Sequence, residues 1–176
     1  MPEPDSATAE VAALVAVQSV LAGKPGVLAA ARGLSHFGEH SIGWLAVSGL
    51  GALVQPERRR DWLLVGAGAF TAHAAAVVIK RVVRRPRPHD PAIAVHVGTP
   101  SRLSFPSAHA TSTTAASILL ARVTGLPLPA LLIPPMALSR LVLGVHYPSD
   151  VVAGVAVGTA VATVVDRLDR RIEGVR

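Results

Sequence analysis

The feature that most constrains this chain is a series of long apolar segments separated by short polar loops. Segment 62–79 contains no Asp, Glu, Lys or Arg. As an α-helix it would be about 27 Å long, at a rise of about 1.5 Å per residue, which approaches the thickness of a bilayer's hydrocarbon core. Further apolar runs cover 9–22, 41–54, 107–121, 126–143 and 150–165. The pattern predicts an all-α protein, a polytopic membrane helix bundle with five or six spans.

The composition agrees with a membrane protein and argues against a nucleic-acid-binding one. Hydrophobic residues make up 51% and charged residues 16%, and the mean hydropathy is +0.47, which is too apolar for an ordinary soluble domain. The formal net charge of +6 would suit nucleic acid, but the arginines flank apolar runs and aromatic residues are only 3%. Cysteine is absent, which excludes disulfides and thiolate metal sites.

No repeat or linker divides the chain, so we expect one domain over residues 1–176. Residues 1–8 are expected to form a disordered tail. The run 9–22 is shorter than the roughly twenty residues that a helix needs to span a bilayer. Residues 9–35 are therefore interpreted as interfacial helices or a short first span. No basic segment precedes this run, which argues against a cleaved signal peptide.

The richest chemical pattern lies where two apolar runs meet, at residues 139–150. Gly144 favours the end of one helix, because glycine adopts the left-handed conformation found there, and Pro148 favours the start of the next. His146 is then expected in the turn between them, with Asp150 in the first turn of the following helix. A carboxylate placed there can hold one ring nitrogen of His146 and leave the other free for nucleophilic attack.

Two further motifs precede this pattern. Residues 80–88 contain Lys-x6-Arg-Pro, residues 106–109 read Pro-Ser-Ala-His, and residues 139–150 contain Ser-Arg-x5-His-x3-Asp. In this order and with these spacings, the motifs resemble the signature of the type 2 phosphatidic acid phosphatase superfamily. Its members are membrane lipid phosphatases, with some haloperoxidase and soluble acid phosphatase relatives. One position departs from the signature, because Ala108 stands where the family usually has glycine.

The resemblance implies a metal-independent phosphomonoester hydrolase and a role for each signature residue. His146 would be the nucleophile and form a phosphohistidine, and Asp150 would orient it. His109 would protonate the leaving oxygen and later activate water. Cationic side chains and backbone N–H groups at a helix start would bind the phosphate. These phosphate-binding residues would be Lys80, Arg87, Ser107, Ala108 and Arg140. The three cations take the place of a metal, so neither a metal nor another cofactor is expected.

The order of the helices supports one site independently of the resemblance. Antiparallel spans would place the end of 62–79, the start of 107–121, the end of 126–143 and the start of 150–165 at one membrane face. Eight arginines mark the opposite face: Arg58, Arg59, Arg60, Arg122, Arg167, Arg170, Arg171 and Arg176. The positive-inside rule then predicts a multi-pass cell-membrane protein whose active site is extracytoplasmic.

A second histidine pattern occurs at residues 36–40, which read His-Phe-Gly-Glu-His. It matches the H-x-x-E-H arrangement of one zinc peptidase class. Zinc binding requires both histidines on one helix face and a further ligand, and Gly38 weakens the helix. A zinc metallopeptidase that uses His36, Glu39 and His40 is kept as a remote alternative. We expect these three residues to contact a substrate headgroup.

The expected partner is a lipid-phosphate substrate in the bilayer, because the site lies at a membrane face. Segment 34–44 resembles that of small actinobacterial members of the family, which implies decaprenylphosphoryl-5-phosphoribose, used in arabinan cell-wall synthesis. Alternatives are undecaprenyl or decaprenyl diphosphate, phosphatidic acid and phosphatidylglycerophosphate. A soluble-type haloperoxidase and a non-enzymatic membrane scaffold are rival interpretations. The apolar spans argue against the first, and the convergent motifs argue against the second.

Overall fold

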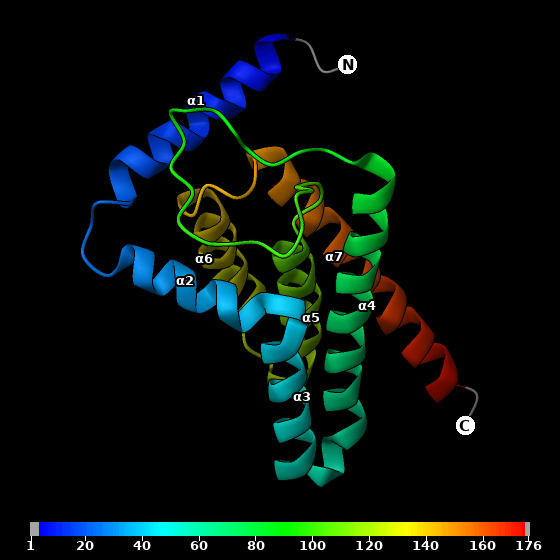
Figure 1. Ribbon diagram of the computed structural model, residues 1–176. Coiled ribbons are helices and arrows are strands. Elements are labelled where there is room, and N and C mark those ends of the chain that lie inside the picture. Colours follow the sequence, from blue (N-terminus) through cyan, green and yellow to red (C-terminus); the bar gives the residue numbers. More distant parts are fainter. Residues whose placement is uncertain (1–3, 175–176) are drawn as a thin grey trace.

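Seven α-helices and two 3₁₀ helices account for most of the described residues, 4–174, of this computed structural model (Figure 1). The only strand-like feature within that range is an isolated bridge between Pro86 and Leu103. The all-α prediction is therefore confirmed. In chain order the elements are α1 (Pro4–Leu21), α2 (Val27–Gly38), η1 (Glu39–Ser41), α3 (Ile42–Val54), η2 (Pro56–Arg58), α4 (Arg59–Val83), α5 (Ala108–Thr124), α6 (Leu128–Val142) and α7 (Pro148–Glu173).

The helices form a bundle that two helices cross. In Figure 1, α3, α4, α5 and α6 run along the bundle and α7 crosses it obliquely. Helix α1 lies at the end at which α4 stops, and α2 crosses the bundle further along, at the level where α3 begins and next to the middle of α4. The irregular segment 84–107, which joins α4 to α5, lies at the same end. This end therefore gathers the three sequence motifs, as the antiparallel order predicts.

The buried centre of the bundle is α5, which packs against α4, α6 and α7. Its buried face consists largely of Ala, Ser and Thr, and small side chains let helix backbones approach closely. Gly158 of α7 meets it directly, because a Cβ added at Gly158 would lie 2.4 Å from the Thr111 carbonyl oxygen. From α3, the indole of Trp44 donates a hydrogen bond to the Thr113 hydroxyl at 3.2 Å.

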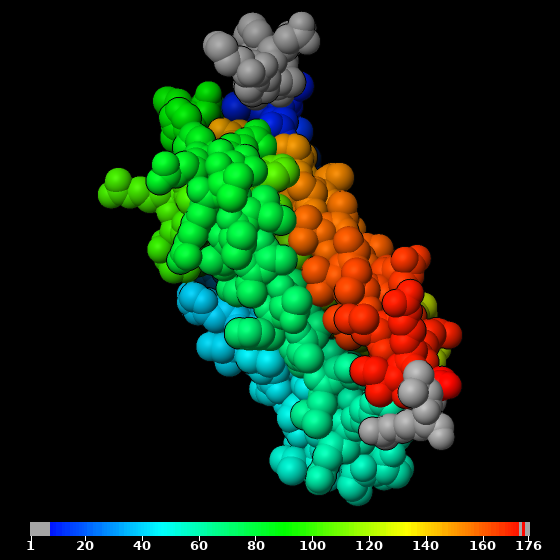
Figure 2. Space-filling model, turned by 90° about the vertical axis from the view of Figure 1, so that its right-hand side faces the viewer, coloured from blue at the N-terminus to red at the C-terminus, as the bar shows by residue number. Residues whose placement is uncertain are grey.

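Helix α7 extends well beyond the predicted run 150–165, because its charged last turns pair with α4 and α5. Asp169 is buried, and its carboxylate lies 2.6 Å from Nη2 of Arg60 and 3.5 Å from Nη2 of Arg122. Nη1 of Arg122 lies 2.5 Å from Oδ1 of Asp166. Figure 2 shows the resulting contact between α7 and α4 along this face. The charged residues Asp166 and Asp169, which follow the apolar run, are thus part of the packed bundle.

Two helical segments within the described residues are long and apolar enough to cross a membrane, Pro56–Val83 and Pro148–Ile172. Shorter apolar helices cover Thr8–Leu21 and Leu128–Val142. Large apolar side chains also face outward on the helices, as with Leu53, which is 74% exposed. Exposed apolar surface of this kind suits contact with lipid.

The N-terminal segment differs from its prediction. Helix α1 begins at Pro4, so the predicted tail 1–8 is helical from that residue onward, and residues 1–3 lie outside the described range. Tertiary contacts explain the order. The Glu10 carboxylate accepts a hydrogen bond from the Ser149 N–H at 3.0 Å. The Gln18 amide donates to the carbonyl of Val142 at 3.0 Å.

Candidate active site

His146 lies in the turn between α6 and α7, as predicted. Gly144 makes this turn possible: its φ is +70°, and a Cβ there would lie 2.3 Å from the Ala94 carbonyl oxygen. Asp150 follows in the first turn of α7, and its Oδ2 lies 3.5 Å from Nδ1 of His146. The same oxygen accepts a hydrogen bond from the Tyr147 N–H at 2.8 Å. Both members of the His146–Asp150 pair are buried, and the carboxylate stands behind the imidazole.

Arg87 identifies which nitrogen of His146 carries the lone pair. Its Nη1 lies 3.3 Å from Nε2 of His146, and a guanidinium can only donate. Nε2 is therefore unprotonated, and the Nδ1 proton faces Asp150. Burial, together with the positive charges of Arg87, Lys80 and Arg140, holds the pKa of His146 well below its ordinary value. The imidazole is thus neutral at neutral pH, which is the form that can attack phosphorus.

Lys80 is bound to the backbone of the loop that precedes α5. Its Nζ donates to the carbonyls of Ser104 at 2.8 Å, Pro106 at 2.7 Å and Leu103 at 3.3 Å. An ammonium group has three hydrogens, so these carbonyls occupy all of its donors. Lys80 therefore shapes this loop and contributes charge to the pocket. It is not an open hydrogen-bond donor, which the sequence could not show.

The two arginines of the motifs differ in how their donors are used. Arg87 donates from Nε to the Ser101 carbonyl at 2.8 Å and from Nη1 to the Val145 carbonyl at 2.6 Å. Burial lowers the pKa of Arg87 to about 10, so it stays charged at neutral pH. Arg140 is only 2% exposed, and its Nε and Nη2 have no hydrogen-bond partner among the described residues. Leaving such donors unpaired is costly, and a bound phosphate would satisfy them.

The start of α5 agrees only partly with the prediction. Ser107 is the N-cap residue, and its hydroxyl accepts a hydrogen bond from the Ala110 N–H. Its own N–H donates to the Asp150 carbonyl at 2.9 Å. A buried N–H needs one partner, and in this structure that partner is the Asp150 carbonyl, so phosphate binding by Ser107 stays a prediction. Ala108, the first residue of the helix, does line the pocket.

His109 is held from behind by α2. Its Nε2 lies 2.9 Å from the Ser35 carbonyl oxygen, which can only accept, so the proton is on Nε2. Nδ1 is the nitrogen left to exchange a proton. The backbone of α2 touches the ring closely at Gly38, where a Cβ would lie 2.6 Å from Cδ2 of His109. The sequence suggested that Gly38 weakens a helix, whereas the structure shows that it makes room for the imidazole.

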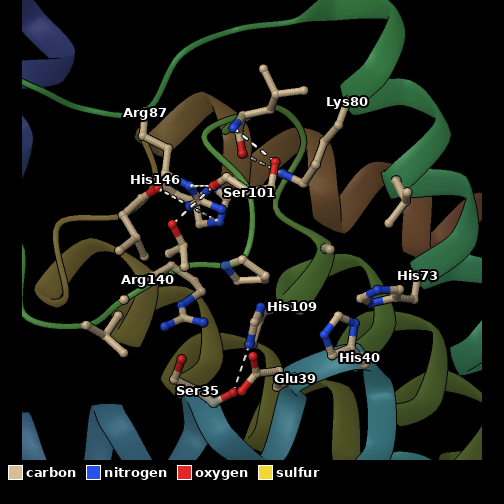
Figure 3. Close-up of a pocket in the computed structure, with 18 of the residues that line it drawn as sticks. Ser35, Glu39, His40, His73, Lys80, Arg87, Ser101, His109, Arg140 and His146 are labelled. Atoms are coloured by element: carbon tan, nitrogen blue, oxygen red, sulfur yellow. Dashed lines mark hydrogen bonds between the residues drawn. The ribbon is translucent and has the colours of Figure 1, made fainter.

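Most of the predicted residues meet in one pocket of about 420 Å³ (Figure 3). This volume is typical of a small-molecule site. In Figure 3, Glu39 and His40 lie on the side of the pocket opposite Arg87 and Lys80. Ser107 and Asp150 do not line it, and they support its wall from behind. The predicted residues that line it are His36, Glu39, His40, Lys80, Arg87, Ala108, His109, Arg140 and His146.

Segment 36–40 does not form the helix that a zinc peptidase needs. Helix α2 ends at Gly38, and His40 has a φ of +49°, so the two histidines are not on one continuous helix face. The His36 imidazole instead lies 4.0 Å from the Glu39 carboxylate. Within residues 4–174, no group of three His, Asp or Glu side chains is placed to hold a metal ion.

The structure adds two residues behind Asp150 that the motifs did not reveal. Arg85 donates from Nη1 to Oδ1 of Asp150 at 3.0 Å, and its Nη2 forms an ion pair with the carboxylate of Glu10. Arg85 lies in a run of arginines in which sequence alone does not separate one role from another. Glu10 did leave a signal, because it is the only charged residue in the apolar run 9–22.

Comparisons with known sequences agree on one family. The model of the PAP2 superfamily matches residues 61–172. The decaprenylphosphoryl-5-phosphoribose phosphatase of Mycolicibacterium smegmatis is 75% identical over 150 residues, which are 85% of this chain and 83% of that protein. The protein of the same name from Mycobacterium tuberculosis is 69% identical over 157 residues, 89% of each chain.

Solved structures agree on the fold. The transmembrane PAP2 type phosphatidylglycerolphosphate phosphatase from Bacillus subtilis superposes with a TM-score of 0.80 at 22% identity, covering 97% of this chain and 89% of that one. LpxE from Aquifex aeolicus gives a TM-score of 0.65 at 17% identity, covering 89% of this chain and 94% of that one. At these identities the likeness concerns the arrangement of the helices.

Proposed function

The chain belongs to the PAP2 superfamily, and from that membership we propose that it removes the phosphate from decaprenylphosphoryl-5-phosphoribose by a metal-independent mechanism. It is a membrane lipid phosphatase, a phosphoric monoester hydrolase. The two relatives that share most of its length and at least 69% of its aligned residues bear that substrate in their names.

One observation supports the chemistry most strongly: a buried, neutral histidine faces a pocket that also contains unpaired guanidinium donors. The lone pair of His146 Nε2 is next to Arg87, and Arg140, which lines the same pocket, has two guanidinium nitrogens without a hydrogen-bond partner among the described residues. A phosphomonoester has its negative charge spread over oxygens that match such donors. The three cations stabilise the charge of the transition state without a metal.

The reaction would proceed in two displacements. In the first, His146 Nε2 forms a bond to phosphorus as the bond to the ester oxygen breaks, and Asp150 stabilises the Nδ1 proton of the charged phosphohistidine. The bound phosphate dianion favours the doubly protonated form of His109, which gives the proton on Nδ1 to the leaving oxygen and keeps the one on Nε2. In the second, water attacks phosphorus, His109 takes the water proton, and inorganic phosphate leaves with His146 restored. Arg87 must turn from His146 Nε2 to the phosphate when substrate binds.

The polar side of the pocket would select the group that bears the phosphate. His36, Glu39 and His40 lie on the same pocket as the cations. Carboxylates commonly accept hydrogen bonds from ribose hydroxyls, so Glu39 would bind the pentose. A polyprenyl diphosphate, the main competing substrate, has a second phosphate at that position, which a carboxylate would repel.

The membrane arrangement would be multi-pass, with α3, α4, α5, α6 and α7 as five spans and α1 and α2 at the interface. Figure 1 supports this arrangement, because α1 and α2 run across the direction of the bundle, in contrast to α3, α4, α5 and α6. The arginines at the start of α4, the end of α5 and the end of α7 belong to the other end, and Arg176 lies outside the described residues. The positive-inside rule then makes the pocket extracytoplasmic.

Phosphate release by the purified protein tests the substrate. We expect the highest kcat/KM with decaprenylphosphoryl-5-phosphoribose among a panel that includes decaprenyl diphosphate, phosphatidic acid and phosphatidylglycerophosphate, with activity retained in EDTA. Glu39→Gln should reduce the preference for the phosphoribose, whereas Glu57→Gln, in η2 outside the pocket, should not. A preference for the diphosphate that Glu39→Gln leaves unchanged would exclude the phosphoribose substrate and retain the general lipid phosphatase.

A further inference from the structure

A polar cluster connects α1 to the back of the His146–Asp150 pair. We call it the Arg85 cluster; its members are Glu10, Arg85, Tyr147, Ser149 and Asp150. Arg85 is its centre, and its guanidinium contacts all four other members. Nη1 donates to Oδ1 of Asp150 at 3.0 Å and to the Ser149 hydroxyl at 2.6 Å, Nη2 pairs with Glu10, and the guanidinium stacks 4.2 Å from the centre of the Tyr147 ring.

These contacts place Arg85 outside the reacting atoms. It does not line the pocket, in contrast to Arg87 two residues later. Asp150 is fully buried and divides its oxygens: Oδ2 faces His146, and Oδ1 accepts from Arg85. A buried carboxylate needs a close counter-charge, and Arg85 supplies both that charge and a directed hydrogen bond. Arg85 on Oδ1 and the Tyr147 N–H on Oδ2 thus both act on the orientation in which Asp150 meets the imidazole.

Glu10 in turn restrains Arg85. Its Oε2 binds Nη2 of Arg85, and its Oε1 accepts the Ser149 N–H at 3.0 Å, so one carboxylate bridges the α4–α5 loop and the start of α7. Gln18 makes the second polar attachment of α1. Its side chain exchanges hydrogen bonds with both the carbonyl and the N–H of Ala94, at 2.6 and 3.1 Å. Glu10 and Gln18 of this apolar helix thus both bind the segments that build the pocket.

We infer that Arg85 is a positioning residue for the His146–Asp150 pair, and that Glu10 of α1 holds Arg85 in place, so that the N-terminal helix completes the active site. The inference rests on the proposed nucleophilic role of His146. It predicts a specific kinetic effect of losing Arg85. Because Arg85 acts through Asp150 and does not touch substrate, its loss should slow the chemical step without weakening phosphate binding.

The test compares kcat, KM and product inhibition by inorganic phosphate in the purified protein, with whichever lipid phosphate the wild type hydrolyses fastest. We expect Arg85→Met to lower kcat by about ten- to a hundredfold, the effect of losing a group that orients a metal ligand from behind. KM and the inhibition constant of inorganic phosphate should stay unchanged. Arg85→Lys should recover part of the loss. Arg84→Met is the matched control, since this neighbouring arginine is exposed and does not line the pocket.

A double-mutant cycle tests the contribution of α1. Glu10→Gln keeps the side-chain volume and should lower kcat, and in an Arg85→Met background it should cause no further loss. Wild-type kcat in Arg85→Met would overturn the inference, and so would a raised KM with weaker inhibition by inorganic phosphate, which would show that Arg85 binds phosphate itself. If the two variants lower kcat additively, Glu10 does not act through Arg85. If Arg85→Met does not fold, the same measurement is made on Arg85→Lys and Glu10→Gln, in which kcat should fall while KM stays unchanged. A wild-type protein that hydrolyses no lipid phosphate would instead refute the proposed function.

Discussion

Nη1 of Arg87 lies 3.3 Å from Nε2 of His146, the atom that would attack phosphorus. The contact has two consequences. The cation next to the imidazole disfavours its protonation, and the guanidinium covers the lone pair until a phosphate competes for it. The resting site is thus neutral at its nucleophile and positive around it, which suits an incoming dianion.

The first prediction concerns pH. Since the pKa of His146 is held well below its ordinary value by burial and by Arg87, the neutral nucleophile persists as the pH falls. In the pH profile of kcat/KM, the acidic limb that comes from ionisation of the enzyme should therefore have its midpoint below about pH 6.5, the usual pKa of histidine. Arg87→Gln should move that limb upward while lowering the rate. A ³¹P NMR titration of the substrate distinguishes ionisation of its phosphate from ionisation of the enzyme. An enzyme limb with its midpoint at or above the ordinary pKa of histidine would contradict the prediction.

The placement of the motif residues was predictable because it follows from helix order, whereas their hydrogen bonds were not. Lys80, His109, Arg140 and His146 lie at helix ends, and antiparallel helices must bring those ends together. Donor and acceptor assignments depend on loop paths that no spacing encodes. Ser107 shows this limit, because its N–H binds the Asp150 carbonyl.

The contacts of α1 and α2 with the site were harder to predict from the sequence. Gly38 has a tertiary role, since only its missing side chain lets α2 lie against His109. Glu10 was visible as a lone charge in an apolar run, but its partner Arg85 is 75 positions away. Long-range pairs of this kind leave no periodic signal, so the sequence indicated that α1 is unusual and not what it binds.

The second prediction concerns the covalent intermediate. His146→Ala should abolish turnover and leave the helical content unchanged, and Asp150→Asn should lower kcat by orders of magnitude, by the orienting logic of a catalytic triad. A rapidly quenched reaction of the wild type with a ³²P-labelled substrate should yield an acid-labile phosphoenzyme that His146→Ala lacks. His109→Ala should accumulate it when the substrate has a good leaving group, because the water that resolves it is no longer activated. Labelled His146→Ala protein would assign the nucleophile to another residue.

The third prediction uses two glycines of α2. Gly38→Ala would bring a methyl group to 2.6 Å from the His109 ring and should lower kcat by displacing the imidazole from its hydrogen bond with Ser35. Gly33→Ala is the matched control, because a Cβ at Gly33 meets nothing within 4 Å on the same helix. In the control, kcat should match the wild type, and alanine should favour the helix slightly. Equal activity of the two variants would mean that the contact between α2 and His109 has no part in the reaction.

The last prediction concerns the side of the membrane on which the pocket opens. The natural chain has no cysteine, so single cysteines at Pro91 and Arg59 can be labelled without background. Both positions are exposed, one in the loop at the pocket end and the other at the start of α4 at the far end. Because Arg58, Arg59, Arg60 and Arg122 and the arginines at the end of α7 lie at the far end, an impermeant thiol reagent added to intact cells should label Pro91→Cys, and should label Arg59→Cys only after the cells are opened. Labelling in the reverse order would place the pocket in the cytoplasm. The five-span arrangement could survive that result, but the lipid headgroup would then have to be presented from the inner leaflet.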